Sequence, residues 1–165
     1  HEGAFVWSDN SAPIFPSASE VGFFPTANNF LVRATGGVVF VSAIDLVGNS
    51  TAAVRLAPGD GSWSSLSDRN VKENLEPVNG EEILANLVAI PVAKWNYISQ
   101  DDAIRHIGPM AQDFHAAFGV GEDDKHITTI DADGVALAAI QALVRQVAEL
   151  KVEIERLKAV DKPEE

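Results

Sequence analysis

The first 66 residues alternate short apolar runs with clusters of turn-forming residues. In one run, Phe30 and Val32 fall on one face of an extended chain, and Leu31 and Arg33 on the other. Gly, Pro, Asn and Asp separate the runs, so the pattern predicts short β-strands. The predicted strands cover residues 4–7, 29–34, 37–43 and 52–57. They are too few for a closed sandwich, and we expect their apolar faces to be buried against further copies of the chain, as in fibrous trimers.

The apolar spacing becomes mainly helical after residue 69. Apolar residues recur at helical spacing over residues 70–88, where Pro77 and Asn79–Gly80 divide the run into two pieces. Asp131 or Asp133 is predicted to cap a final helix. Between these helices the pattern predicts a strand over 92–98, an extended segment and then a helix over 104–119, and a short strand over 127–131. The complete pattern predicts an α+β fold that is β-rich first and mainly helical afterwards.

The final helix, predicted over residues 134–160, carries a heptad pattern. Two sets of apolar residues recur every seven positions, offset by three, which is the a/d seam of a coiled coil. The seam residues are Ile140, Leu143, Val147, Leu150, Ile154 and Leu157. Glu153 and Lys158 then occupy g and e positions, where they can bridge neighbouring helices. The alternative is a single amphipathic helix that packs on its own domain. The pattern predicts self-association but does not decide between a dimer and a trimer.

Charge changes at the same place as the pattern. Residues 1–66 contain five acidic and two basic side chains, a net charge of −3, whereas residues 67–165 contain 19 and 10, a net charge of −9. We therefore expect two domains, residues 1–66 and residues 67–165. The total charge of −12 argues against nucleic acid or an anionic membrane as partner.

Other features of the composition restrict the chemistry. The chain has no cysteine, which excludes disulfides, thiolate zinc sites and a cysteine nucleophile. No apolar run approaches the roughly 18 residues that span a bilayer. The N-terminus lacks the pattern of a secretory signal, and we expect the sequence to be a piece of a longer protein.

Ser67 and Lys72 are the strongest candidates for chemistry. A serine beside a neutral lysine can act as a nucleophile whose proton the lysine takes, provided that burial lowers the lysine pKa from about 10.4. On one regular helix, a spacing of five places two side chains about 140° apart. The pair therefore meets only if Ser67 lies on an extended lead-in and Lys72 turns back, or if the two come from different subunits. The alternative is that Ser67 or Asp68 only caps a helix that begins near Asn70.

The remaining candidates have simpler interpretations. His115 and His126 lack partners at metal-ligand spacing, and the DADG segment at residues 131–134 lacks the rest of a calcium loop. There is no glycine-rich phosphate loop and no GxSxG motif. We expect neither a metal nor a cofactor.

Four ordered motifs that begin at residue 65 resemble a known family. The motifs SLSDRNVKENLEPV, AKWNYI, IRHIGPMAQDF and GVALAAIQALVRQVAEL are similar to the C-terminal intramolecular chaperone domain of phage tail spikes and fibres, the family named for endosialidase. The resemblance covers about residues 66–158. The β-rich residues before it resemble the stalk sequences that precede this domain in tail-fibre-like proteins.

The resemblance implies a function and a set of residues. The domain would form a homotrimer, help its own upstream stalk to fold in register, and then cut itself at the Leu66–Ser67 bond. Ser67 would be the nucleophile and Lys72 the general base. Asp68 would support them, and His106 in the HIG motif matches a functionally important histidine of the family. Gln112 matches a position that we interpret as structural. The protein would act in the producing cell and then reside in a phage tail or at a bacterial surface.

Two other functions are compatible with the sequence. One is a trimerisation cap that stays attached and never cuts. The other is a fibre tip that binds a surface glycan through exposed aromatic residues, with Trp7, Phe15, Phe23 and Phe24 as candidates. Self-cleavage separates the first alternative from the leading hypothesis, and glycan binding by residues 1–66 would favour the second.

Overall fold

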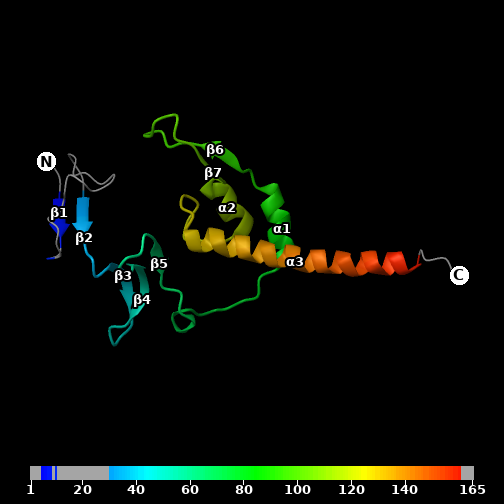
Figure 1. Ribbon diagram of the computed structural model, residues 1–165, viewed down its shortest axis with the longest axis horizontal. Coiled ribbons are helices and arrows are strands. Elements are labelled where there is room, and N and C mark those ends of the chain that lie inside the picture. Colours follow the sequence, from blue (N-terminus) through cyan, green and yellow to red (C-terminus); the bar gives the residue numbers. More distant parts are fainter. Residues whose placement is uncertain (1–4, 9, 11–29, 161–165) are drawn as a thin grey trace. The chain divides into compact units, whose positions relative to one another are not determined.

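The computed structural model describes residues 5–8, 10 and 30–160 (Figure 1). The chain divides into two compact units, residues 1–75 and residues 76–165. In the described residues, the first unit contains strands and one 3₁₀ turn, whereas the second contains α-helices and a two-stranded hairpin. The predicted α+β class and the long C-terminal helix are therefore confirmed. The candidate aromatic residues Phe15, Phe23 and Phe24 lie outside the described residues.

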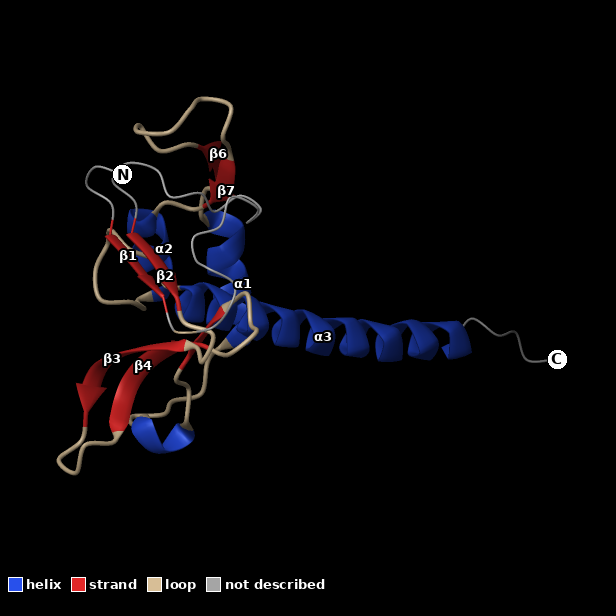
Figure 2. Ribbon diagram, turned by 60° about the vertical axis from the view of Figure 1, so that its left-hand side comes forward, coloured by secondary structure: helices blue, strands red, loops and turns tan. Residues whose placement is uncertain are grey.

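The first unit contains two small sheets (Figure 2). In one sheet the strands β1 and β2 are parallel, and in the other the order β3-β4-β5 is antiparallel throughout. The bounds are Phe5–Ser8 for β1, Phe30–Arg33 for β2, Val38–Ile44 for β3, Ser50–Leu56 for β4 and Trp63–Ser65 for β5. The pattern did not predict β5, because only three residues take part and two of them are serines.

A side-chain-capped turn joins β3 to β4. The carboxylate of Asp45 accepts hydrogen bonds from the backbone N–H of Val47 at 3.0 Å and of Asn49 at 2.8 Å. Gly48 in this turn has a φ of 92°, which a residue with a side chain rarely adopts. The amide of Asn49 also donates to Asp45 at 2.8 Å and holds the pKa of Asp45 below its ordinary value. These contacts fix the register of the hairpin locally.

No described residue of strands β2 to β5 is buried in the single chain. Phe40 and Trp63 stack with ring centroids 5.6 Å apart, yet both remain more than half exposed. Ile44 is 62% exposed. A sheet with open apolar faces is only marginally stable alone, which is consistent with the expectation that other copies cover it.

In the second unit, α1 packs against the first half of a long helix, α3, and α2 packs against α1 (Figures 1 and 2). Asn79 caps α1 through the backbone N–H groups of Glu81 and Glu82. Gly80 allows α1 to approach α3 closely, because a Cβ at this position would lie 2.8 Å from the Cβ of Ala142. The helices are α1 Gly80–Ala89, α2 Ala111–Phe118 and α3 Thr129–Val160, and the hairpin consists of β6 Ala93–Trp95 and β7 His106–Gly108.

The helix predicted to begin at Asn70 does not form over residues 70–79. One 3₁₀ turn, η1 (Arg69–Val71), is followed by chain outside any helix or strand until Gly80. Pro77 cannot donate a backbone hydrogen bond, and the helical hydrogen bonds begin only after the cap at Asn79.

Residues 127–131 do not form a strand either, because α3 already begins at Thr129. The hydroxyl of Thr128 accepts from the backbone N–H of Asp131 at 3.1 Å and donates to the Asp131 carboxylate at 2.7 Å. Thr128 is thus the capping residue, and the predicted caps, Asp131 and Asp133, lie inside the helix.

The core of the second unit is small. Its buried apolar side chains are Phe114 of α2 and Val135, Ala139 and Ala142 of α3. Both views show the second half of α3 extending beyond α1 and α2 (Figures 1 and 2). No described helix has the length and the low polarity needed to span a membrane.

Candidate functional site

Ser67 and Lys72 come together at the end of β5. Ser67 precedes η1, and Lys72 follows it in an extended conformation with φ −121° and ψ 145°. The intervening 3₁₀ turn reverses the chain, so that Lys72 Nζ lies 2.6 Å from Ser67 Oγ. A regular helix could not bring these two side chains together, whereas a short turn between two extended residues does.

Asp68 supports the turn. Its carboxylate accepts hydrogen bonds from the backbone N–H and the side-chain amide of Asn70, both at 2.9 Å. Asp68 is therefore the N-cap of η1 and holds the conformation on which the contact between Ser67 and Lys72 depends.

The Leu66–Ser67 bond lies between a paired strand and this turn. The backbone N–H of Leu66 donates to the carbonyl of Ala53 at 2.8 Å, so the pairing of β5 with β4 continues to Leu66. Ser67 and Lys72 are both exposed in the single chain, and Lys72 forms no ion pair with a described residue. The ammonium group thus has the Ser67 hydroxyl as its hydrogen-bond partner.

His106 lies in the second unit, in a cluster of its own. It follows the turn of the β6–β7 hairpin, where its ring lies tilted against Trp95 with centroids 4.8 Å apart and meets Tyr97 edge-on with centroids 5.7 Å apart. His106 Nε2 lies 3.0 Å from Gln100 Oε1. Residues 92–98 were predicted as one strand, but only Ala93–Trp95 pair, and the residues after Trp95 form this turn.

The hydrogen bonds determine the tautomer of His106. Gln100 Oε1 also accepts the backbone N–H of Tyr97 at 3.1 Å, and a backbone N–H can only donate. The atom that faces His106 is therefore the amide oxygen, so Nε2 of His106 carries a proton and the neutral ring keeps its acceptor at Nδ1. The sequence assigns Gln100 only to a polar turn, and no spacing rule marks it as the partner of His106.

The predicted seam residues form an exposed apolar stripe on α3. Their exposed fractions lie between 48% and 62%, and a shallow groove of about 440 Å³ lies between Ile140, Val147 and Lys151. The seam consists of Ile140, Leu143, Val147, Leu150, Ile154 and Leu157. Exposed apolar surface of this extent on one helix face is typical of an interaction site.

The two charged residues predicted to bridge neighbouring helices have partners within α3. Glu153 pairs with Arg156 at 2.7 Å, and this guanidinium holds the pKa of Glu153 below its ordinary value. Lys158 pairs with Glu155 at 2.9 Å. A bridge between helices would have to exchange these exposed local pairs, which contribute little to stability.

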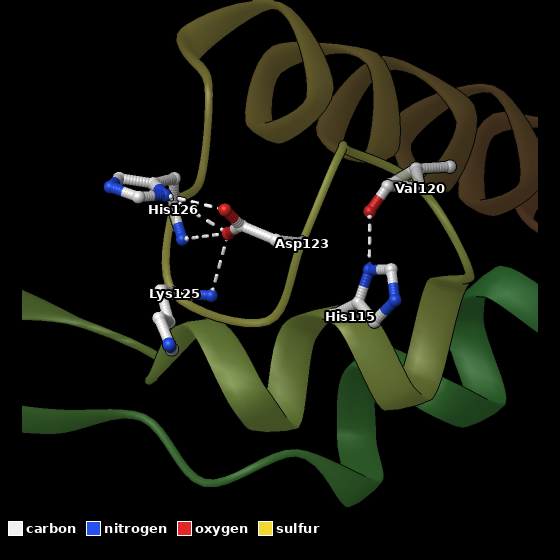
Figure 3. Close-up of polar contacts among 5 residues, drawn as sticks. All are labelled: His115, Val120, Asp123, Lys125 and His126. Carbon is white, nitrogen blue, oxygen red and sulfur yellow. Dashed lines mark hydrogen bonds and ion pairs between the residues drawn. The ribbon is translucent and has the colours of Figure 1, made fainter.

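The other two histidines in the described residues have local structural partners (Figure 3). His115 Nδ1 lies 3.0 Å from the carbonyl of Val120, and His126 Nδ1 lies 2.9 Å from the carboxylate of Asp123. The backbone N–H of Lys125, with His126, holds the pKa of Asp123 below its ordinary value. These contacts order the loop before α3 at pH values above the ordinary pKa of an aspartate and are lost as the pH falls through the lowered value.

No group of three or more potential metal ligands occurs among the described residues. Gln112 is exposed in the first turn of α2. Neither observation adds a residue to the candidate site.

Comparison with known proteins identifies the segment that begins at this site. Residues 67–120 match the peptidase S74 family, described as the chaperone of endosialidase. No curated protein and no solved structure matches the chain. The match starts at Ser67 and continues through η1, α1, the hairpin with His106 and α2. Residues 67–120 are therefore similar to the chaperone-of-endosialidase family, and this match supports an intramolecular chaperone domain in this part of the chain.

Proposed function

We propose that this chain assembles as a homotrimer, helps its upstream stalk to fold, and then releases the chaperone domain by cutting its own Leu66–Ser67 bond. The observation that carries the proposal is the 2.6 Å contact between Lys72 Nζ and Ser67 Oγ. A serine whose hydroxyl touches a lysine amine is the arrangement of a Ser–Lys dyad. The family match that begins at Ser67 supports the same assignment.

The proposed reaction is a single hydrolysis for each chain. Ser67 Oγ attacks the carbonyl carbon of Leu66, and Lys72 accepts the hydroxyl proton. The C–N bond breaks, the Leu66 acyl group moves to Ser67 Oγ as an ester, and the amine of Ser67 takes up a proton. Water then hydrolyses the ester and yields a carboxylate on Leu66 and a free hydroxyl on Ser67. Asp68 supports this reaction by holding the turn, and His106 is a further candidate from the second unit.

Exposure links the proposed cut to assembly. Ser67 and Lys72 are exposed in the single chain, and a lysine can act as a base only when it is neutral. Burial favours the neutral form of an amine. We propose that the neighbouring chains of the trimer cover the dyad, so that the cut follows folding.

The arrangement of elements is suited to a chaperone of this kind. Aligning three β-rich chains is slow, because contacts between distant residues must form before they stabilise the structure. Helix α3 forms through contacts that are local in sequence, so its exposed seam can bring three chains together early, which raises the effective concentration of their stalk ends. Removal of residues 67–165 afterwards would make unfolding hard to reverse and would increase kinetic stability. Residues 1–66 are then the end of a stalk, in a phage tail or at a bacterial surface.

Denaturing gel electrophoresis after refolding tests the proposal. Self-cleavage predicts fragments of 66 and 99 residues, with Ser67 at the new N-terminus. Ser67→Ala and Lys72→Ala should each remain a single full-length band. Ser65→Ala and Lys125→Ala, which change the same residue types at exposed positions, should cut normally. A wild-type chain that stays intact after prolonged incubation as a folded assembly would refute the dyad.

The second candidate function is a trimerisation cap that never cuts. The exposed seam on α3 favours it, because this surface needs partners whether or not the chain is cleaved. An intact wild-type chain of trimeric mass would support this function, whereas a folded monomer would contradict both.

A further inference from the structure

Arg55 lies beside the proposed cleavage bond. It pairs with Ser64 across the β4–β5 ladder, and the hydrogen bond from Leu66 to Ala53 continues the same register. Side chains alternate between the faces of a strand, so Arg55 and Leu66 project from one face as diagonal neighbours, with Cα atoms roughly 7–8 Å apart. The long side chain of an arginine spans this distance.

The two residues also share a groove. Its volume is about 390 Å³, and its lining comes from β3, β4, β5 and the residues up to Ser67. Among the described residues that line it, Arg55 is the only charged one. Arg55 is exposed and forms no ion pair with a described residue. Its guanidinium donors are therefore available to an anion in this groove.

The position of Arg55 is unusual for its segment. Residues 1–66 contain only two basic residues, Arg33 and Arg55, against five acidic ones. A cation next to the cleavage bond is thus not explained by a generally basic surface. The segment places one of its two cations on the face and in the groove that contain Leu66.

We propose that Arg55 binds the carboxylate that self-cleavage creates on Leu66, and so holds the new C-terminus of the stalk against β4. The inference rests on the proposed cleavage, in which one peptide bond and one water become a carboxylate on Leu66 and an amine on Ser67. Arginine is suited to this ligand because its planar guanidinium can donate two parallel hydrogen bonds to one carboxylate.

The same cation acts in the opposite sense on the other product. An α-amine has a pKa of about 7.7–8.0, so the new N-terminus of Ser67 is mainly an ammonium at neutral pH. The guanidinium of Arg55 repels this ammonium. Cleavage therefore replaces an uncharged peptide bond by two charged ends. Arg55 on β4 attracts the carboxylate of the stalk end and repels the ammonium of the chaperone end.

Hydrogen exchange at the Leu66 amide tests this inference, because its bond to Ala53 reports whether the strand end is docked. In the cut wild-type chain this amide should remain protected. In the cut Arg55→Met chain it should exchange at least ten times faster. Cut Arg55→Lys should lie between them. Equal protection in cut wild type and cut Arg55→Met would overturn the inference. The intact Ser67→Ala chain is the control, because it has no carboxylate on Leu66. Adding Arg55→Met to this chain should leave the exchange rate of the Leu66 amide unchanged.

A second measurement needs no variant of Arg55. With ¹³C-labelled leucine in the cut wild-type chain, the carboxyl group of Leu66 should titrate below the ordinary α-carboxyl range of about 3.3–3.7. An unshifted titration would refute the contact. If the gel shows that the wild-type chain never cuts, the cleavage proposal and this inference both fail. If the chain cuts but the carboxyl group is unshifted, only the binding by Arg55 fails.

Discussion

Replacing Val147 by alanine tests the seam of α3. Val147 is 48% exposed in the single chain, and Val→Ala removes two methyl groups, which contribute about 0.8 kcal/mol each when fully buried. About half of this contribution remains to be gained on association, which is about 0.8 kcal/mol for each chain. Three chains together lose about 2.4 kcal/mol, so the trimer dissociation constant should rise roughly 50-fold.

Val152 provides a matched control on the same helix. It lies outside the predicted seam at an f position and is 71% exposed, so Val152→Ala makes the same chemical change where no partner helix is expected. The gain in helix propensity is common to both variants and cancels in the comparison. Sedimentation equilibrium in urea, on the Ser67→Ala background, measures the dissociation constants. Equal constants for the two variants, or a wild-type chain that is monomeric throughout, would refute the assignment of the seam.

Two further predictions concern the second unit. Gly80→Ala should lower the free energy of unfolding by about 1–3 kcal/mol, because its Cβ would lie 2.8 Å from the Cβ of Ala142. Gly134→Ala should instead raise the free energy of unfolding by about 0.5–1 kcal/mol, because no atom lies within 4 Å of the added Cβ. Thermal unfolding measures both changes, and the same sign for the two variants would contradict the close packing of Gly80 against Ala142. Gln100→Met should allow the ring of His106 to populate both neutral tautomers, which ¹⁵N NMR of labelled histidine detects on the Ser67→Ala background. A spectrum identical to that of the unsubstituted glutamine would show that Gln100 does not determine the tautomer.

Local patterns predicted strands β1 to β4 and the heptad of α3, but they failed elsewhere for both helices and strands. The heptad of α3 is readable because every member lies within two turns of the next on one face. The run over residues 127–131 misled because Ile127 and Thr128 have strand-forming side chains, yet the Thr128 hydroxyl caps α3. Strand β5 was missed because a strand of three residues is defined by its partner, β4, and not by its own pattern.

The candidate site, too, was predictable from the sequence only in part. Residue type nominated Ser67 and Lys72, and helix geometry showed that a regular helix could not join them. Only the folded turn shows which alternative holds within one chain, because the capping of η1 by Asp68 sets the backbone angles between them. The partnership of Gln100 with His106 and the position of Arg55 beside Leu66 were not predicted, since both depend on hairpin pairing.

By itself, the sequence determined the order of β-rich and helical parts, the apolar heptad stripe of α3, and the residue types of the proposed self-cleavage. These follow from periodicity and from side-chain chemistry, which are local properties of the chain. Tertiary structure alone decided that Ser67 Oγ meets Lys72 Nζ, that Nε2 of His106 carries a proton, and that Arg55 shares a groove with Leu66 and Ser67. Each of these depends on the direction in which the backbone turns, and that direction is set by caps, turns and strand pairing that residue spacing does not specify.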